Sequence, residues 1–129
     1  MLKEHATHFY LEDKCNCAEA VVLAANAEYN LGLSDDVCKL VGGFGAGVSC
    51  GSTCGALLGA ISVYGVMKMG RRAMETYGFN KKCGDLARDF MERMGDSNCS
   101  ALIIFTDKFL KLISRECRNL CWDKKSAIF

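Results

Sequence analysis

The stretch GGFGAGVSCGSTCGALLGA, residues 42–60, begins as a glycine-rich segment and ends as an apolar run. No alternating strand pattern surrounds it, so we expect a glycine-rich loop that leads into a buried helix. That helix is predicted to begin near Ser52 or Thr53 and to end near Gly70. The glycines fit neither of the phosphate-binding patterns G-x-x-x-x-G-K-S/T and G-x-G-x-x-G. They instead let the backbone pass close to another helix or to a cofactor.

A longer window, from Leu40 to Met67, contains no charged residue and is long enough to span a bilayer. Some of its glycines recur at every fourth residue, as they do in contacts between membrane helices. Eight glycines in the window would nevertheless weaken one continuous helix by roughly 1 kcal/mol each relative to alanine. We therefore expect no membrane span.

Apolar residues recur at helical spacing along most of the remaining chain. The first predicted helices are a short one over residues 2–12, one over 16–31 that Gly32 ends, and a short one that Ser34 caps. Later in the chain, we predict a helix over 80–94 that Gly95 closes, and one long or two short helices over 98–125. No linker separates them. The fold class is therefore all-α: one domain over residues 1–129, a helical bundle of about five to six helices.

Length, charge and cysteine content restrict the function classes. A chain of 129 residues, half of them hydrophobic, is long enough for one domain with its own core. A net charge of +1 argues against a dedicated nucleic-acid binder, which carries a basic patch or stripe. The charged N-terminal stretch shows no signal peptide, so we expect a cytoplasmic protein, in which stable disulfides are rare. Nine cysteines in such a protein indicate metal or redox chemistry.

Three cysteines stand at predicted helix starts, each directly after a residue that caps helices. They are Cys17 after Asn16, Cys54 after Thr53 and Cys99 after Asn98. Unpaired N–H groups and the positive end of the helix dipole favour a thiolate there, so we expect the pKa of each thiol to be lowered. The alternative for any one of them is core packing as a small hydrophobe. The repeated pattern favours a functional role for the group.

Other cysteine pairs have the spacing of a helix face. Cys50 with Cys54 and Cys117 with Cys121 are four residues apart, a spacing that in a helix places two side chains on one side, where they could share a metal. A helix that begins near Ser52 or Thr53 leaves Cys50 in the glycine-rich loop, which weakens the first pair. No C-x-x-C pair occurs, so the thioredoxin, haem-attachment and zinc-ribbon patterns are absent. Any site must therefore be assembled by the fold from distant segments.

Several stretches resemble a family of small redox-active proteins named for their C_GCAxxG_C_C pattern. The likeness lies in NCAEAVVLAANAEYNLGLSDD (16–36), in residues 42–60, in MGDSNCSALI (94–103) and in a late cysteine. The CGAxxG motif stands here as residues 54–59. The resemblance covers most of the chain from Asn16 to Cys121. It implies a small helical protein with four characteristic cysteines, at Cys17, Cys54, Cys99 and Cys117, with Cys121 as the alternative to Cys117.

The relatives of this family include the split-Soret cytochromes, whose similar helical domain holds an iron–sulfur cluster beside haem. The haem does not carry over, because its attachment motif is missing here. Cys15 and Cys50 lie close to matched cysteines, so either could replace a ligand or act as a resolving thiol.

The first functional hypothesis is electron transfer or redox sensing through an iron–sulfur cluster, of the 2Fe–2S type, held by those four thiolates. Gly45 and Gly47 would bring backbone N–H groups to the cluster sulfurs, and Gly55 and Gly59 would let neighbouring helices approach. A second hypothesis is a metal-free thiol–disulfide protein that uses Cys17 and Cys54. A zinc-stapled bundle and a helical interaction module with inert thiols are further alternatives. We find no side chain placed to act as the acid or base of another kind of reaction. A redox partner protein is expected. The apolar helices also allow a homodimer.

Overall fold

The structure, a computed structural model, describes residues 1–103. Its helices are α1 (Leu2–Leu11), α2 (Cys17–Tyr29), α3 (Asp35–Lys39), α4 (Gly55–Lys68), α5 (Phe79–Met94) and α6 (Cys99–Ile103), with short turns η1 (Gly42–Phe44), η2 (Gly47–Gly51) and η3 (Ala73–Glu75). No β-strand occurs within these residues, so the all-α prediction is confirmed. Most of the predicted last helical region, with Cys117 and Cys121, lies outside the described residues.

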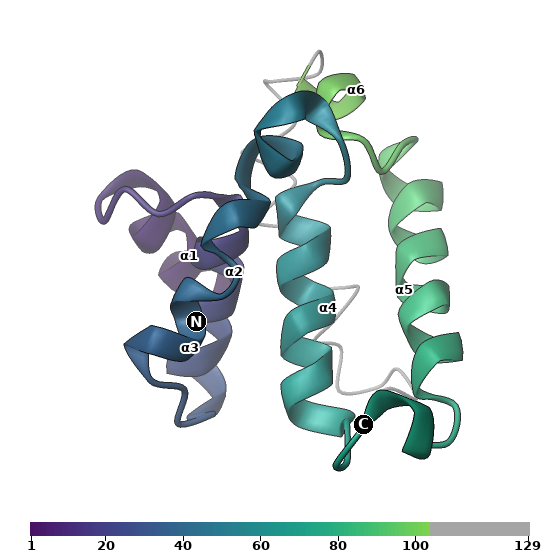
Figure 1. Cartoon of the computed structure of the whole chain (residues 1–129). Coiled ribbons are helices and arrows are strands. Elements are labelled where there is room, and N and C mark those ends of the chain that lie inside the picture. The colour runs from purple at the N-terminus through teal and green to yellow at the C-terminus, as the bar shows by residue number, and fades with distance from the viewer. Residues whose placement is uncertain (104–129) are drawn as a thin grey trace.

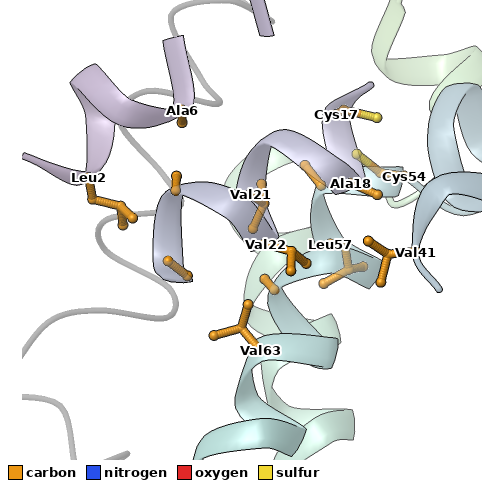
Figure 2. Packing of buried hydrophobic residues seen from close by; sticks show 14 of the residues in the cluster. Leu2, Ala6, Cys17, Ala18, Val21, Val22, Val41, Cys54, Leu57 and Val63 are labelled. Atoms are coloured by element: carbon orange, nitrogen blue, oxygen red, sulfur yellow. The ribbon is translucent and has the colours of Figure 1, made fainter. Parts of the chain in front are cut away.

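Helix α4 forms the middle of the arrangement, between the group α1–α3 and helix α5 (Figure 1). Small side chains on α2, including Ala18 and Val21, are buried against it. An added Cβ at Gly59 would lie 2.9 Å from the carbonyl oxygen of Ala18, so only glycine allows this approach. Leu57 and Val63 of α4 pack with Val22 and Val41 in the same core (Figure 2). The prediction of a central buried helix is therefore confirmed.

Helix boundaries agree with the sequence where side-chain caps decide them. Asn16 and Ser34 cap α2 and α3, and Gly95 ends α5 in the left-handed conformation. The predicted end of α2 at Gly32 is wrong, because Asn30 already adopts the left-handed conformation (φ 50°). Asparagine tolerates that conformation better than most residues, which is why the helix ends earlier.

The predicted start of α4 at Ser52 or Thr53 is also wrong. Thr53 instead forms an isolated antiparallel bridge with Asn98, so its backbone is extended and Cys54 becomes the N-cap residue. A tertiary contact therefore sets this helix start two to three residues later than local sequence suggests.

The glycine-rich segment is more structured than a plain loop. It contains η1 and η2, and residues 46–49 all have positive φ values. Val48, with φ 59°, is a β-branched residue in a conformation that costs an L-residue about 1–2 kcal/mol. The surrounding contacts must offset this cost, which indicates that the shape of the segment is set by what it packs against.

No helix within residues 1–103 is long and apolar enough to cross a membrane.

Candidate functional site

Three cysteines occupy three helix starts and are all buried. Cys17 is the first residue of α2, Cys54 is the N-cap of α4, and Cys99 is the first described residue of α6. Their exposed fractions are 6%, 1% and 3%. Ionised Cys17 and Cys99 would both raise the pKa of Cys54, and ionised Cys17 would raise the pKa of Cys99, so the three lie in one neighbourhood. We call this group the cysteine triad.

A reciprocal pair of backbone hydrogen bonds sets Cys54 beside Cys99. Residues 52–54 and 97–99 run antiparallel around the Thr53–Asn98 bridge. The backbone N–H of each cysteine donates to the carbonyl oxygen of the serine two residues before the other cysteine, at 2.7 Å in both cases. The Ser-Thr-Cys and Ser-Asn-Cys triplets are therefore equivalent partners, and the two helix starts are held side by side.

Cys17 reaches this place from α2 because a glycine begins α4. An added Cβ at Gly55 would lie 2.6 Å from the sulfur of Cys17 and 2.6 Å from the carbonyl oxygen of Phe44. The Cys17 sulfur thus rests directly on the backbone of α4. Figure 2 shows the sulfur atoms of Cys17 and Cys54 turned toward one another.

The start of α2 is fixed by Asn16, which joins it to the glycine-rich segment. The Asn16 Oδ1 accepts from the N–H groups of Ala18 (3.0 Å) and Glu19 (3.1 Å), and its Nδ2 donates to the carbonyl oxygen of Gly42 at 2.7 Å. The Glu19 carboxylate in turn accepts from the backbone N–H of Asn16. Sequence reasoning missed this reciprocal cap, although the Asn-x-x-Glu spacing is a sign of it.

The four glycines named as cofactor neighbours all lie at close backbone approaches. A Cβ added at Gly47 would lie only 2.7 Å from the Cβ of Cys99, so there is no room for a side chain at this position. Gly55 is in contact with Cys17. Gly45 faces the Asn16 side chain, where a Cβ would lie 2.6 Å from Cγ, and Gly59 faces α2. Two of the four therefore border the triad directly, and the other two place α2 beside it.

The expectation of lowered thiol pKa values is wrong for Cys54 and Cys99. Burial raises the pKa of Cys54 above its ordinary value, although hydrogen bonds from the backbone N–H groups of Leu57 and Ala56 lower it. Burial also raises the pKa of Cys99, and a neighbouring Cys17 thiolate would raise it further. The donors of the helix start are present as expected, but loss of water around the sulfur has the larger effect.

These shifts predict how stability depends on pH in the reduced, metal-free protein. Because Cys54 and Cys99 have a higher pKa in the folded than in the unfolded chain, the unfolded chain loses their protons first. Their contribution is complete below the ordinary thiol pKa of 9.0 and is lost as pH rises through the higher folded values. We expect urea unfolding to show a falling free energy of unfolding above that pH. A C54A variant should fall less steeply, and an equal slope would contradict the assignment.

The remaining described cysteines do not join the triad. Cys38 is buried on α3, while Cys15 and Cys83 are partly exposed. Cys50 is exposed in η2, where its thiol donates to the carbonyl oxygen of Gly47 at 3.4 Å. The predicted shared helix face of Cys50 and Cys54 is wrong, because α4 begins after both residues.

Nothing in residues 1–103 forms a ready-made metal site: no three His, Cys, Asp or Glu side chains there are arranged to hold an ion. The described cysteines are also all free, without a disulfide among them. Cys117 and Cys121, the two candidates for the late ligand, lie outside the described residues.

Comparison with known proteins identifies relatives. The model of the family described as "Putative redox-active protein (C_GCAxxG_C_C)" matches residues 15–125. A protein of Archaeoglobus fulgidus, described as "Uncharacterized protein", is 33% identical over 124 residues, which cover 88% of this chain and 79% of that protein. No solved structure matches the chain. The family match covers most of the sequence and contains the cysteine triad, so this chain belongs to the C_GCAxxG_C_C family.

Proposed function

We propose that this chain is an electron-transfer or redox-sensing protein whose centre is an iron–sulfur cluster on Cys17, Cys54, Cys99 and one late cysteine. Cys117 is the proposed fourth ligand, with Cys121 as its alternative. One observation carries the proposal: three thiols from segments far apart in sequence are buried together at three helix starts.

The donor chemistry of the triad fits such a group. Thiolates are the ligands of iron–sulfur clusters, and a thiolate whose pKa is raised by burial needs a cation beside it to stay ionised. Two backbone N–H groups, of Ala56 and Leu57, already bond to the Cys54 sulfur and would stabilise its negative charge. The triad therefore fits a cluster in the type of donor atom and in its burial. The arrangement of the ligands around the cluster would be completed when the cluster binds.

The chain's own residues would bind the cluster and shield it. When bound, a cluster supplies a redox couple whose potential depends on hydrogen bonds to sulfur and on exposure to solvent. Gly55, at the start of α4, packs on Cys17, and Gly47 of the glycine-rich segment packs on Cys99, which limits the access of water. We favour the 2Fe–2S type for this cluster.

The proposal also places the protein in the cytoplasm, because free thiols persist in that compartment. A protein that exchanges electrons with this one is expected as its redox partner. A homodimer stays a prediction.

A metal-free thiol–disulfide protein is the second candidate, because the sulfurs of Cys17 and Cys54 face one another (Figure 2). Their oxidation would form one S–S bond and release two protons and two electrons to an oxidised disulfide of a partner. That exchange requires a partner sulfur to reach one of the two thiols, and both are nearly inaccessible to solvent. Burial therefore favours the cluster, which exchanges electrons without direct contact at sulfur.

An absorbance spectrum with iron and zinc analysis, on protein purified without oxygen, tests the proposal. We expect visible charge-transfer bands and stoichiometric iron. A colourless, metal-free protein whose free-thiol count changes by two on reduction would replace the cluster with the disulfide. A colourless protein with stoichiometric zinc would make the site structural and contradict both.

A further inference from the structure

The connector between α4 and α5 carries large apolar side chains that project into solvent. We define residues 66–82 as the basic tip. Within it, Met74 and Tyr77 have exposed fractions of 87% and 105%, and Val66 and Met69 are exposed as well. The tip lies at the end of α4 opposite the glycine-rich segment (Figure 1). Single exposed apolar residues are ordinary, but several gathered on one short segment and bordered by charged residues mark an interaction surface.

The same residues concentrate positive charge. Five basic residues stand against one acidic residue, so the tip carries +4: Lys68, Arg71, Arg72, Lys81 and Lys82 against Glu75. The other described residues, 1–65 and 83–103, contain five basic and eleven acidic residues and therefore carry −6. Arg71 pairs with Glu75 and Lys81 with Asp85, but these exposed ion pairs are weak, so the side chains of Arg71 and Lys81 can still meet an anion. The chain is therefore strongly polarised in charge.

We propose that the basic tip docks on the surface of an anionic lipid bilayer. Lys and Arg would approach the lipid phosphates, and Met74 and Tyr77 would insert at the headgroup boundary, where tyrosine's apolar ring and polar hydroxyl are both accommodated. An acidic protein surface is the alternative occupant, and the comparison of lipid vesicles with soluble polyglutamate below distinguishes the two.

The distribution of charge along the chain also determines how the molecule would be oriented on the bilayer. The described residues outside the tip, 1–65 and 83–103, are negative and are repelled by anionic lipid, so this part of the molecule favours an approach with the tip first. Helix α4 has 14 residues, about 21 Å at its helical rise, and separates the tip from Cys54. The cysteine triad would therefore face the aqueous side. This inference does not depend on the redox chemistry proposed above.

Sedimentation of the full chain with lipid vesicles tests the docking. We expect binding to vesicles of phosphatidylcholine mixed with phosphatidylglycerol, little binding to phosphatidylcholine alone, and weaker binding at high salt. The double variant R71Q/R72Q should lose about fivefold in affinity for each charge removed. The double variant M74S/Y77S should lose about tenfold.

The matched control is K39Q/M91S, which removes one exposed basic residue and one exposed methionine away from the tip. It should bind as the unaltered chain does, and circular dichroism should show that all variants keep their helices. Three results would overturn the proposal: no binding to anionic vesicles, equal loss in the control, or binding to soluble polyglutamate without binding to vesicles, which would indicate an acidic protein partner.

Discussion

Replacement of Cys54 by serine should remove the proposed iron–sulfur centre, with iron content and visible absorbance lowered at least about tenfold. Cys54 is the most deeply buried thiol of the triad and is influenced by both of the others. It also receives the two backbone N–H groups of the α4 start. A serine hydroxyl stays protonated at neutral pH and is a poor ligand for a soft metal, so the site would lose its central donor.

The matched control is C38S, on α3. Cys38 is also buried, but only the carboxylate of Asp35 adds to the effect of burial on its pKa, so no neighbouring thiol acts on it. We expect C38S to keep its iron and absorbance and to lose only about 1 kcal/mol of stability, the cost of burying a hydroxyl. Retained absorbance in C54S, or equal loss in C38S, would contradict the placement of the centre.

The second large effect is expected from alanine at Gly55. The new Cβ would lie 2.6 Å from both the Cys17 sulfur and the Phe44 carbonyl oxygen, closer than such atoms can approach. Overpacking of this kind costs about 1–3 kcal/mol. Relief of the contact would displace Cys17 from the triad, so G55A should lose cofactor as well as stability, measured by iron content and urea unfolding.

Gly65 in the same helix provides a control of opposite sign. An added Cβ there would meet only the Phe79 ring edge, at an ordinary 3.8 Å. Because alanine favours a helix interior over glycine by about 1 kcal/mol, G65A should stabilise the protein and leave the centre unchanged. If both substitutions changed stability in the same direction, the close approach of α4 to Cys17 would be refuted.

The helices were largely predictable from sequence because local signals define most of them. Asn16 and Ser34 each accept hydrogen bonds from the first turn of their helix, and Gly95 takes the left-handed conformation that closes α5. Such interactions involve residues two to four apart, so the sequence displays them directly. The helix predicted over 80–94 follows the same logic, because apolar residues recur there at helical spacing, and Leu86 and Phe90 of α5 are buried.

The features that sequence did not show depend on distant partners. The start of α4 was misplaced because Thr53 pairs with Asn98, a contact that no local pattern reveals. The thiol pKa values were misjudged for a similar reason, since the helix starts were recognised but the depth of burial around Cys54 was not. The residue types of the triad were readable in advance, whereas their common burial followed only from the fold.

The Thr53–Asn98 bridge has a consequence for the timing of assembly. Its two sides are about 45 residues apart, so the triad belongs to the part of the fold with high contact order. A chain emerging from the ribosome can form α1 and α2 early, but it can bring Cys54 and Cys99 together only after the later segment has been synthesised. Until then Cys17 and Cys54 remain without their third neighbour. Assembly of the proposed centre would therefore be a late step in the maturation of this protein, after most of the chain has been made.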